Sequence, residues 1–290
     1  MSAPAATLEI LTRVTPLAIR FWDEADGRVV SAGLIVEVYP RDEPERRVAA
    51  QPNRVGIFVV PRLPGRRDPA FEFGAGDAAF WRGLVQRPHV IEVTDRDGHF
   101  QPFSLEQPLP AKGLVVPACL PPQSPPVEAV PLFSSPSRPV PTGMAVLRTE
   151  LRTAGPMVAG QATSAPASWA VLDVHVAGQP PVRGVADREG RVAVVFPYPE
   201  PIASPARPSS PPYAAGQSLW DQEWIVRLDA FYDPSMPASD APDLCRTLNQ
   251  PPALLWAGSS GARPLPDQTL RYGQELVVRD LFLTAAESPP

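Results

Sequence analysis

The segments VVSAGLIVEVYP (Val29–Pro40) and NRVGIFVVPRLPG (Asn53–Gly65) identify the fold class of this sequence. From Leu34 to Tyr39 one set of alternate positions is Leu, Val and Val, a period of two that is typical of a strand with one face on a core. In the second segment, Gly56 opens the apolar run IFVV, and the preceding NRVG predicts a tight turn, because Asn and Gly tolerate a positive φ. The two segments therefore predict neighbouring strands of a small β-sandwich.

A second copy of this arrangement follows later in the chain. The strand-like AVLDVHV (Ala170–Val176) precedes DREGRVAVVFPYP (Asp187–Pro199), in which Gly190 is expected to hold the same place in its turn as Gly56. We therefore predict an all-β protein of two antiparallel β-sandwich domains joined by a proline-rich linker. The predicted boundaries are 1–116 for the first domain, 117–142 for the linker and 143–290 for the second domain, with a proline-rich insertion at 197–212.

Proline is the outlier in composition. The chain has 41 prolines among 290 residues, nearly three times the usual share of about 5%. Proline lacks an N–H group and is excluded from helix interiors, so this density favours short strands and stiff loops over an α-rich fold. Nine prolines lie between Pro117 and Pro141, which favours an extended, semi-rigid linker there.

The alternation also predicts the two cores. In the first domain the expected core residues are Leu34, Val36, Val38, Phe58, Val60, Ile91 and Val93. In the second they are Leu172, Val174, Val194, Phe196, Val226 and Leu228. One short helix is expected within Ala241–Leu255, because Asp243–Leu248 has helical spacing and Pro242 fits the first helical position.

Charge and hydropathy exclude several classes of partner. The net charge is −5 and the basic residues are scattered, so nucleic acid is not an expected partner. The N-terminal sequence MSAPAATLEILTRV has neither a basic region nor a long apolar region, which predicts no secretory signal. No window approaches the roughly 18 consecutive apolar residues of a membrane span. A cytoplasmic location, or incorporation into a released particle, is the expectation.

The two cysteines, Cys119 and Cys245, are far apart in the sequence and fall outside any paired motif. Two reduced, unpaired thiols are the expectation for a cytoplasmic protein, and a disulfide joining the domains is the alternative.

No catalytic or metal-binding constellation is visible. The three histidines, His89, His99 and His175, have no partner ligand at metal-binding spacing. No G-x-S-x-G elbow is present, and the paired serines lie in proline-rich segments that are poorly suited to hold a nucleophile. We therefore predict a protein that is not an enzyme and has no catalytic residue, metal or cofactor.

Aromatic side chains in predicted loops are the candidate contacts. The segment 64–88 carries several aromatic residues flanked by arginines, which is unusual for a solvated connection. It either folds back over the sandwich or presents an aromatic surface to a partner. The candidate partner contacts are Phe71, Phe73, Phe80, Trp81, Arg66, Arg67 and Arg82 in this segment, with Trp220 and Trp224 in a second one.

The first domain resembles a known family. The pattern V-x-x-A-G-x-x-V-x-V at Val29–Val38 and N-x-x-G-x-F-V-V-x-x-L-P-G at Asn53–Gly65 is similar to the prealbumin-like, or carboxypeptidase regulatory-like, domains. The similarity covers about residues 17–110 and includes VIEVTDRDGHF, whereas the second copy lacks the G-x-F and L-P-G elements. The whole chain, including PLFSSPSRPVPTGMAVLRTEL (residues 131–151) and GRVAVVFPYPEP (residues 190–201), also resembles proteins encoded with phage-tail-like contractile injection systems.

These resemblances imply a structural or accessory part of a particle. The expected function is a non-enzymatic structural or adaptor protein that docks on the protein subunits of a larger assembly, without nucleic acid or membrane insertion. The alternative is a carbohydrate- or peptide-binding β-sandwich module, in which the aromatic residues form a stacking platform.

Overall fold

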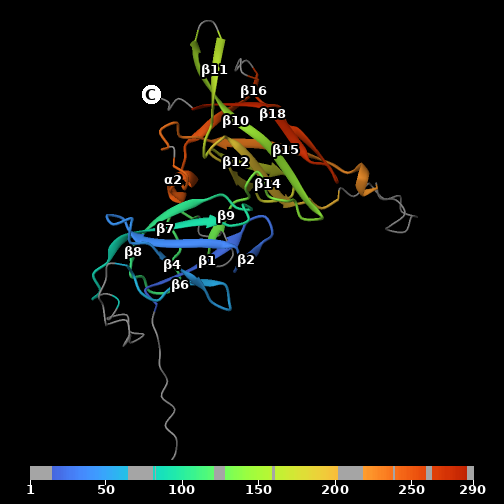
Figure 1. Cartoon of the computed structure of the whole chain (residues 1–290). Helices are drawn as coiled ribbons and strands as arrows, with labels where there is room; N and C mark the ends of the chain where they lie inside the picture. Colours follow the sequence, from blue (N-terminus) through green and yellow to red (C-terminus); the bar gives the residue numbers. More distant parts are fainter. Residues whose placement is uncertain are drawn as a thin grey trace, which may run out of the picture.

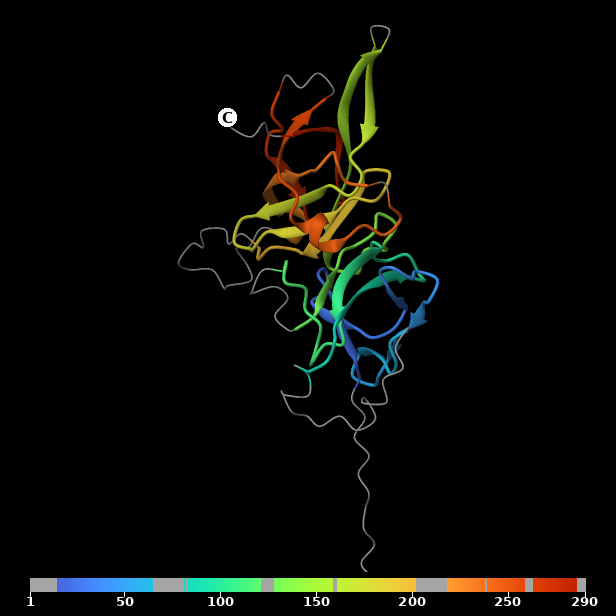
Figure 2. The ribbon, with the colours of Figure 1, turned by 90° about the vertical axis from the view of Figure 1, so that its left-hand side faces the viewer.

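The computed structural model contains two β-rich modules, one above the other in Figure 1 and again in the view turned by 90° in Figure 2. The structure describes residues 15–64, 81, 83–120, 128–158, 161–201, 218–237, 239–258 and 263–285. Strands dominate the described residues, and the described helical elements are one short α-helix and one 3-10 turn. The predicted all-β class is confirmed.

The N-terminal module is a sandwich of two sheets. One sheet has the order β2-β1-β6-β5, with β9 also paired to β1, and the other has the order β4-β3-β7-β8. The first sheet contains β1 (Leu17–Asp23), β2 (Arg28–Val30), β5 (Gln51–Pro52), β6 (Ile57–Val60) and β9 (Val130–Leu132). The second contains β3 (Leu34–Pro40), β4 (Val48–Ala49), β7 (Arg87–Asp95) and β8 (Phe103–Leu109).

Alternating side chains fill the space between these two sheets. In β1 every second residue is buried, from Leu17 to Asp23, as the period of two requires. Phe21 lies at the centre, with its ring centroid 5.3 Å from that of Phe58 and 6.4 Å from that of Phe103, both in edge-on geometry. All seven predicted core residues of this module are buried: Leu34, Val36, Val38, Phe58, Val60, Ile91 and Val93.

The C-terminal module is built on one nine-stranded sheet. Its order is β11-β10-β18-β16-β15-β12-β13, with β14 paired to β10 and β17 paired to β15. The strands are β10 (Met144–Val158), β11 (Gln161–Pro166), β12 (Val171–Val176), β13 (Val182–Val185), β14 (Arg191–Pro197), β15 (Glu223–Phe231), β16 (Pro252–Ala257), β17 (Gln268–Arg271) and β18 (Leu276–Ala285).

This sheet curls around its own core, so that β13 and β14 pack together. A Cβ atom added to Gly184 of β13 would lie 2.6 Å from a methyl group of Val194 in β14, which shows how closely the two strands approach. The six predicted core residues of the module are all buried: Leu172, Val174, Val194, Phe196, Val226 and Leu228.

The two predicted turns have the same geometry. Gly56 and Gly190 have φ values of +77° and +79°. In each turn an Asx side chain accepts two backbone N–H groups: Asn53 Oδ1 from Val55 and Ile57, and Asp187 Oδ1 from Glu189 and Arg191, all at 2.9–3.0 Å. The prediction that the two glycines occupy equivalent turns is confirmed.

The segment 117–142 differs from the extended linker that its prolines predict. Its residues Val130–Leu132 form β9, which pairs in parallel with β1, Phe21 opposite Val130. Val130 and Leu132 are fully buried in the N-terminal core. The expectation of a stiff connection is wrong for this part of the segment, because a parallel edge strand tolerates the single Pro131 between two apolar residues.

The short helix lies where its sequence predicts it. Helix α2 (Leu244–Leu248) begins after the N-cap Asp243, whose side chain accepts a hydrogen bond from the backbone N–H of Arg246 at 2.7 Å. Pro242 therefore precedes the N-cap and does not occupy the first helical position. Asp243 takes the N-cap because its carboxylate can accept a free N–H group of the first turn.

Candidate functional site

Six of the predicted partner contacts lie outside the described residues: Phe71, Phe73, Phe80, Arg66, Arg67 and Arg82. Trp81 is described and is partly buried. The prediction of an aromatic contact surface in this loop stays a prediction.

The structure separates the other two candidate tryptophans. Trp220 exposes 74% of its surface, whereas Trp224 exposes 4%. Trp224 belongs to β15, points into the core of the C-terminal module and donates its indole N–H to the carbonyl oxygen of Glu200 at 3.3 Å. The prediction that Trp224 contacts a partner is wrong, because the alternation of β15 directs it inward together with Val226.

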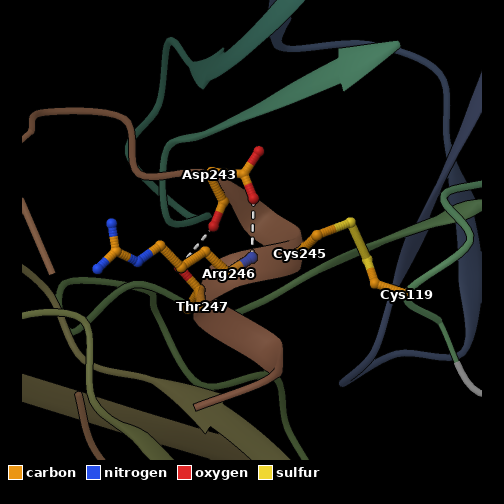
Figure 3. Close-up of a disulfide and its surroundings, with 5 residues drawn as sticks. All are labelled: Cys119, Asp243, Cys245, Arg246 and Thr247. Carbon is orange, nitrogen blue, oxygen red and sulfur yellow. Dashed lines mark hydrogen bonds between the residues drawn. A yellow bond between two sulfur atoms is a disulfide. The ribbon is translucent and has the colours of Figure 1, made fainter.

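A disulfide joins the two modules. Cys119 and Cys245, 126 residues apart in sequence, have their Cα atoms 5.4 Å apart and their sulfur atoms bonded. Figure 3 shows the bond between the segment that follows β8 and helix α2. The expectation of two unpaired thiols is wrong, and the alternative of a disulfide between the domains is the observed arrangement. Spacing alone could not identify the pair, because the approach depends on how the modules pack.

Helix α2 is held against the N-terminal module by more than the disulfide. Ser104 of β8 donates its backbone N–H to Pro242 at 2.8 Å and its hydroxyl to Ala241 at 3.1 Å. Leu244 of the helix is 2% exposed and packs in the N-terminal core cluster. The segment 241–248 thus continues the packing of β8, although it belongs to the second half of the chain.

Two further strands of the C-terminal module take part in this packing. Val171 of β12 and Val185 of β13 belong to the same buried cluster as the N-terminal core. The buried side chain of Gln101 donates its amide N–H to the carbonyl oxygen of Val185 at 3.1 Å. The junction is therefore a shared apolar core crossed by a buried hydrogen bond, which disfavours independent motion of the modules.

A buried arginine fixes the polypeptide where it passes from one module to the other. The guanidinium of Arg138 donates to both carboxylate oxygens of Asp23, at 2.8 and 2.6 Å, and to the hydroxyl of Ser134. Its side chain is 6% exposed and that of Asp23 is 7% exposed. Arg148 of β10 donates to the carbonyl oxygens of Pro136 and Arg138, and its Nε lies 2.8 Å from Glu275. The connection is bonded to both modules at once.

A cleft of about 900 Å³ lies along this junction. Its walls come from the hairpin end around Thr94–Pro102, from the connection at Ser135–Ser137, and from β10, β14 and β18. Phe100, Pro102 and Val277 form apolar parts of the wall, and charged residues of both signs, including Arg279 and Asp280, form polar parts. Such a cleft has the volume of a ligand or peptide site.

The strand β18 is irregular where it borders the cleft. Its register against β10 shifts between Thr149 and Leu151, and Asp280 has a φ of +56°. The hydroxyl of Thr149 is buried and has no hydrogen-bond partner among the described residues. A bulge and a positive φ outside glycine are common at functional sites, but neither identifies a reaction.

Burial favours the acid form of a carboxyl group close to the junction. The pKa of Glu24 is raised, first because burial disfavours its charged form and second because Asp23 is a neighbouring anion, while Arg183 acts in the opposite direction. One oxygen of Glu24 is buried without a hydrogen-bond partner. Arg183 itself is held by Asp173 through two bonds of 2.7 Å.

Four aromatic rings form a row at the outer end of the C-terminal module. The centroid distances are 5.7 Å from Trp224 to Tyr198, 4.7 Å from Tyr198 to Tyr272, and 5.7 Å from Tyr272 to Trp220. The row runs from the buried Trp224 to the exposed Trp220. Sequence analysis did not identify Tyr198 or Tyr272, because they come from separate segments that meet only in the folded chain.

Metal and membrane chemistry receive no support from the described residues. Among them no group of three or more His, Cys, Asp or Glu side chains is placed to hold a metal ion. His175 pairs with Asp229 at 2.9 Å, on the outer surface of β12 and β15. Within the same part of the chain, no helix has the length and apolar character needed to cross a membrane.

Comparison with known proteins gives no family assignment. No family model and no curated protein matches this chain. Among solved structures, the crystal structure of the shaft pilin spaA from Lactobacillus rhamnosus GG matches at 8% sequence identity, covering 94% of this chain and 98% of the pilin chain. Its TM-score is 0.23, a value too low for the similarity to support a functional argument.

Proposed function

We propose that this chain is a non-enzymatic structural adaptor, in which two β-modules held as one body bridge two sites of a larger assembly. The observation that carries the proposal is the junction: a disulfide, a buried Arg138–Asp23 pair and a shared apolar core join modules from opposite ends of the sequence. A bridge between subunits benefits from such a fixed geometry, because binding then costs no conformational entropy for ordering the two modules. A domain pair that closes over a substrate would need a weaker junction.

The state of the cysteines supports a role without catalysis. Both are bonded to each other, so neither is a thiolate nucleophile in this state. The cleft has walls of mixed character, and two of the three arginines that line it, Arg148 and Arg191, are already paired with Glu275 and Asp187. These pairs favour a structural role for the arginines over activation of a substrate.

The assembly that we propose is a phage-tail-like contractile injection system, on the resemblance described above. The disulfide favours the released particle over the cytoplasm as the place of action, because structural disulfides persist in oxidising surroundings. The aromatic loop with Phe80 and Trp81 is the proposed anchor on the partner, with Arg66, Arg67 and Arg82 around it.

Co-sedimentation tests this proposal. The tagged full chain is expressed in the producing cell, particles are collected by ultracentrifugation, and the bound fraction is measured against chain concentration. We expect co-sedimentation, and we expect Phe80→Ala/Trp81→Ala to weaken it by about 2 kcal/mol or more, the effect of losing an interface hot spot. Leu254→Ala, an exposed apolar residue of the other module, is the matched control.

Two results would contradict the adaptor function. One is a chain that never co-sediments with any large assembly. The other is a purified chain that turns over a substrate. If the chain co-sediments with a particle of another kind, the proposed adaptor function stands and only the proposed contractile injection system is contradicted.

A further inference from the structure

Trp220 is an exposed aromatic residue that is not part of a hydrophobic core. It exposes 74% of its surface, whereas Trp169 and Trp224 expose 2% and 4%. A large indole surface in water forfeits the burial that normally stabilises a tryptophan. The exposed ring is therefore a feature that folding alone does not account for.

The backbone nevertheless holds this ring in one place. Trp220 lies in the 3-10 turn Leu219–Asp221, and its backbone N–H donates a hydrogen bond to the side-chain hydroxyl of Ser218. Its ring packs edge-on against Tyr272, with the centroids 5.7 Å apart and the planes at 79°. The indole is ordered by contacts before any ligand arrives, which lowers the entropy cost of binding.

Gly273 makes room for the indole. A Cβ atom at this position would lie 2.8 Å from Cζ3 of Trp220, and Gly273 also has a φ of +70°. Its N–H donates to the hydroxyl of Tyr198 at 2.9 Å, which fixes the turn beneath the ring. Any side chain at Gly273 would displace the indole. The turn between β17 and β18 therefore forms the surface on which the Trp220 ring packs.

Polar groups with free bonding capacity lie close in sequence to Trp220 and Tyr272, on the exposed face of β15 and β17. Glu223 and Arg271 are partners across β15 and β17, and Arg271 Nε donates to Glu223 Oε1 at 2.8 Å. Both side chains are more than half exposed. The terminal guanidinium nitrogens of Arg271 have no partner among the described residues, so they can donate to a ligand.

We propose that Trp220 and Tyr272, together with the exposed Arg271–Glu223 pair of the adjoining strands, form a binding site for a neutral oligosaccharide. A pyranose ring has an apolar C–H face that stacks on an indole and hydroxyl groups around its edge that bond to a guanidinium and a carboxylate. A phosphate or sulfate group fits less well, because Glu223 repels it. An apolar peptide fits less well, because the exposed apolar neighbour in the turn is Leu219 alone among the described residues.

The test uses the purified full chain and is independent of the proposed assembly. Isothermal titration calorimetry and tryptophan fluorescence follow binding of hexamers of β-1,4-linked glucose, N-acetylglucosamine, xylose and mannose, and of α-1,4-linked glucose. We expect at least one of them to bind with a dissociation constant of about 1 mM or tighter. Trp220→Ala should weaken it by about tenfold or more, the effect of losing one stacked ring.

Three variants separate the site from general changes in the surface. Trp220→Phe should retain most of the affinity, because a flat ring remains. Gly273→Ala should lower the affinity with Trp220 itself intact, since the added methyl group displaces the indole. Val55→Ala, an exposed apolar residue of the N-terminal module at 66%, should leave the affinity unchanged.

The proposal is overturned if no hexamer binds, or if Trp220→Ala binds as tightly as the wild type. Binding of a proline-rich peptide in place of every hexamer would also overturn it and would assign the ring to a protein partner. Circular dichroism of each variant confirms that the fold is kept.

Discussion

Gly56 and Gly190 occupy the same kind of turn, yet their surroundings differ. A Cβ atom at Gly56 would meet a methyl group of Val29 at 3.0 Å and the Cβ of Ser31 at 3.2 Å. At Gly190 it would lie 2.3 Å from the carbonyl oxygen of Leu151, a backbone atom that cannot move without disturbing β10. The two turns should therefore tolerate a side chain to different degrees.

We expect Gly190→Ala to lower the free energy of unfolding by about 3 kcal/mol or more, and Gly56→Val by more than about 1 kcal/mol, because a positive φ and a collision act together. Gly143→Ala is the control, with a φ of +82° and no atom within 4 Å, and should cost only about 1 kcal/mol. Denaturant unfolding measures all three. Equal losses of stability at the three positions would show that the atoms around each glycine do not determine the cost. An unchanged stability in Gly56→Val would contradict the assignment of Gly56 to a turn that requires a positive φ.

Glu24 predicts a pH-dependent stability. Its pKa is raised above the ordinary value of 4.5 by burial, with Asp23 adding to the effect. The acid form is favoured in the folded chain, so the group's contribution is complete below pH 4.5 and is lost as pH rises through the raised pKa. Glu24→Gln keeps a neutral side chain at every pH.

The measurement is the difference in unfolding free energy between Glu24→Gln and the wild type, at pH values from acid to neutral. We expect the variant to gain stability relative to the wild type as pH rises. A difference that stays flat with pH would contradict the raised pKa.

At the scale of single residues, the sequence predicts what depends on near neighbours. The core positions and the two turn glycines follow from alternation and from Asx-x-x-Gly patterns, which act over a few residues. Residues whose environment comes from distant segments were predicted poorly: Trp224 was expected at the surface, and the aromatic row through Tyr198 and Tyr272 was not foreseen. Both depend on which segments of the C-terminal module meet.

Among the elements, the strands with one buried face could be predicted from the sequence, but strand β9 in the segment between the two modules could not. Segment 130–132 contains too few apolar residues to stand out from its prolines, and its pairing with β1 depends on an edge that only the folded sandwich provides. Strand β10 runs for 15 residues and changes partner along its length, from β14 to β11, while the sequence indicates only its first part.

The disulfide is expected to contribute strongly through the unfolded chain. It joins residues 126 positions apart, and a loop of this length corresponds to about 5 kcal/mol in the chain-entropy account, with about 3 kcal/mol as a more typical yield. Reduction, or Cys119→Ser/Cys245→Ser, should lower the free energy of unfolding by about 3–5 kcal/mol.

Reductant should not change the double variant further, which makes it the control. Thiol labelling of the untreated chain under denaturing conditions should find no free cysteine. Labelling of both cysteines without reductant would contradict the bond, and an unchanged stability after complete reduction would contradict its contribution.

The connection at Arg138 gives a second prediction at this scale. Arg138→Ala leaves the carboxylate of Asp23 buried without its cation, so we expect a loss of about 3–5 kcal/mol in denaturant unfolding. Arg46→Ala removes an exposed partner of Glu43 and should change stability by less than about 1 kcal/mol. A similar small effect for both would show that the Arg138 pair does not hold the connection.

For the whole molecule, the sequence indicates two β-modules but not how they are joined. Cys119, Leu244 and Val185 carry no signal of the junction, because each is an ordinary residue of its own segment until the modules pack. The candidate contacts of the aromatic loop stay predictions, since all of them except Trp81 lie outside the described residues.

The central claim is that the two modules form one rigid body, and residual dipolar couplings of backbone N–H groups test it most directly. The couplings from the N-terminal and C-terminal modules are fitted separately to alignment tensors in a weakly aligned sample of the oxidised chain. The account predicts one tensor, equal in size and orientation for both modules. Two tensors of different size would contradict it, because they would show that the modules move independently.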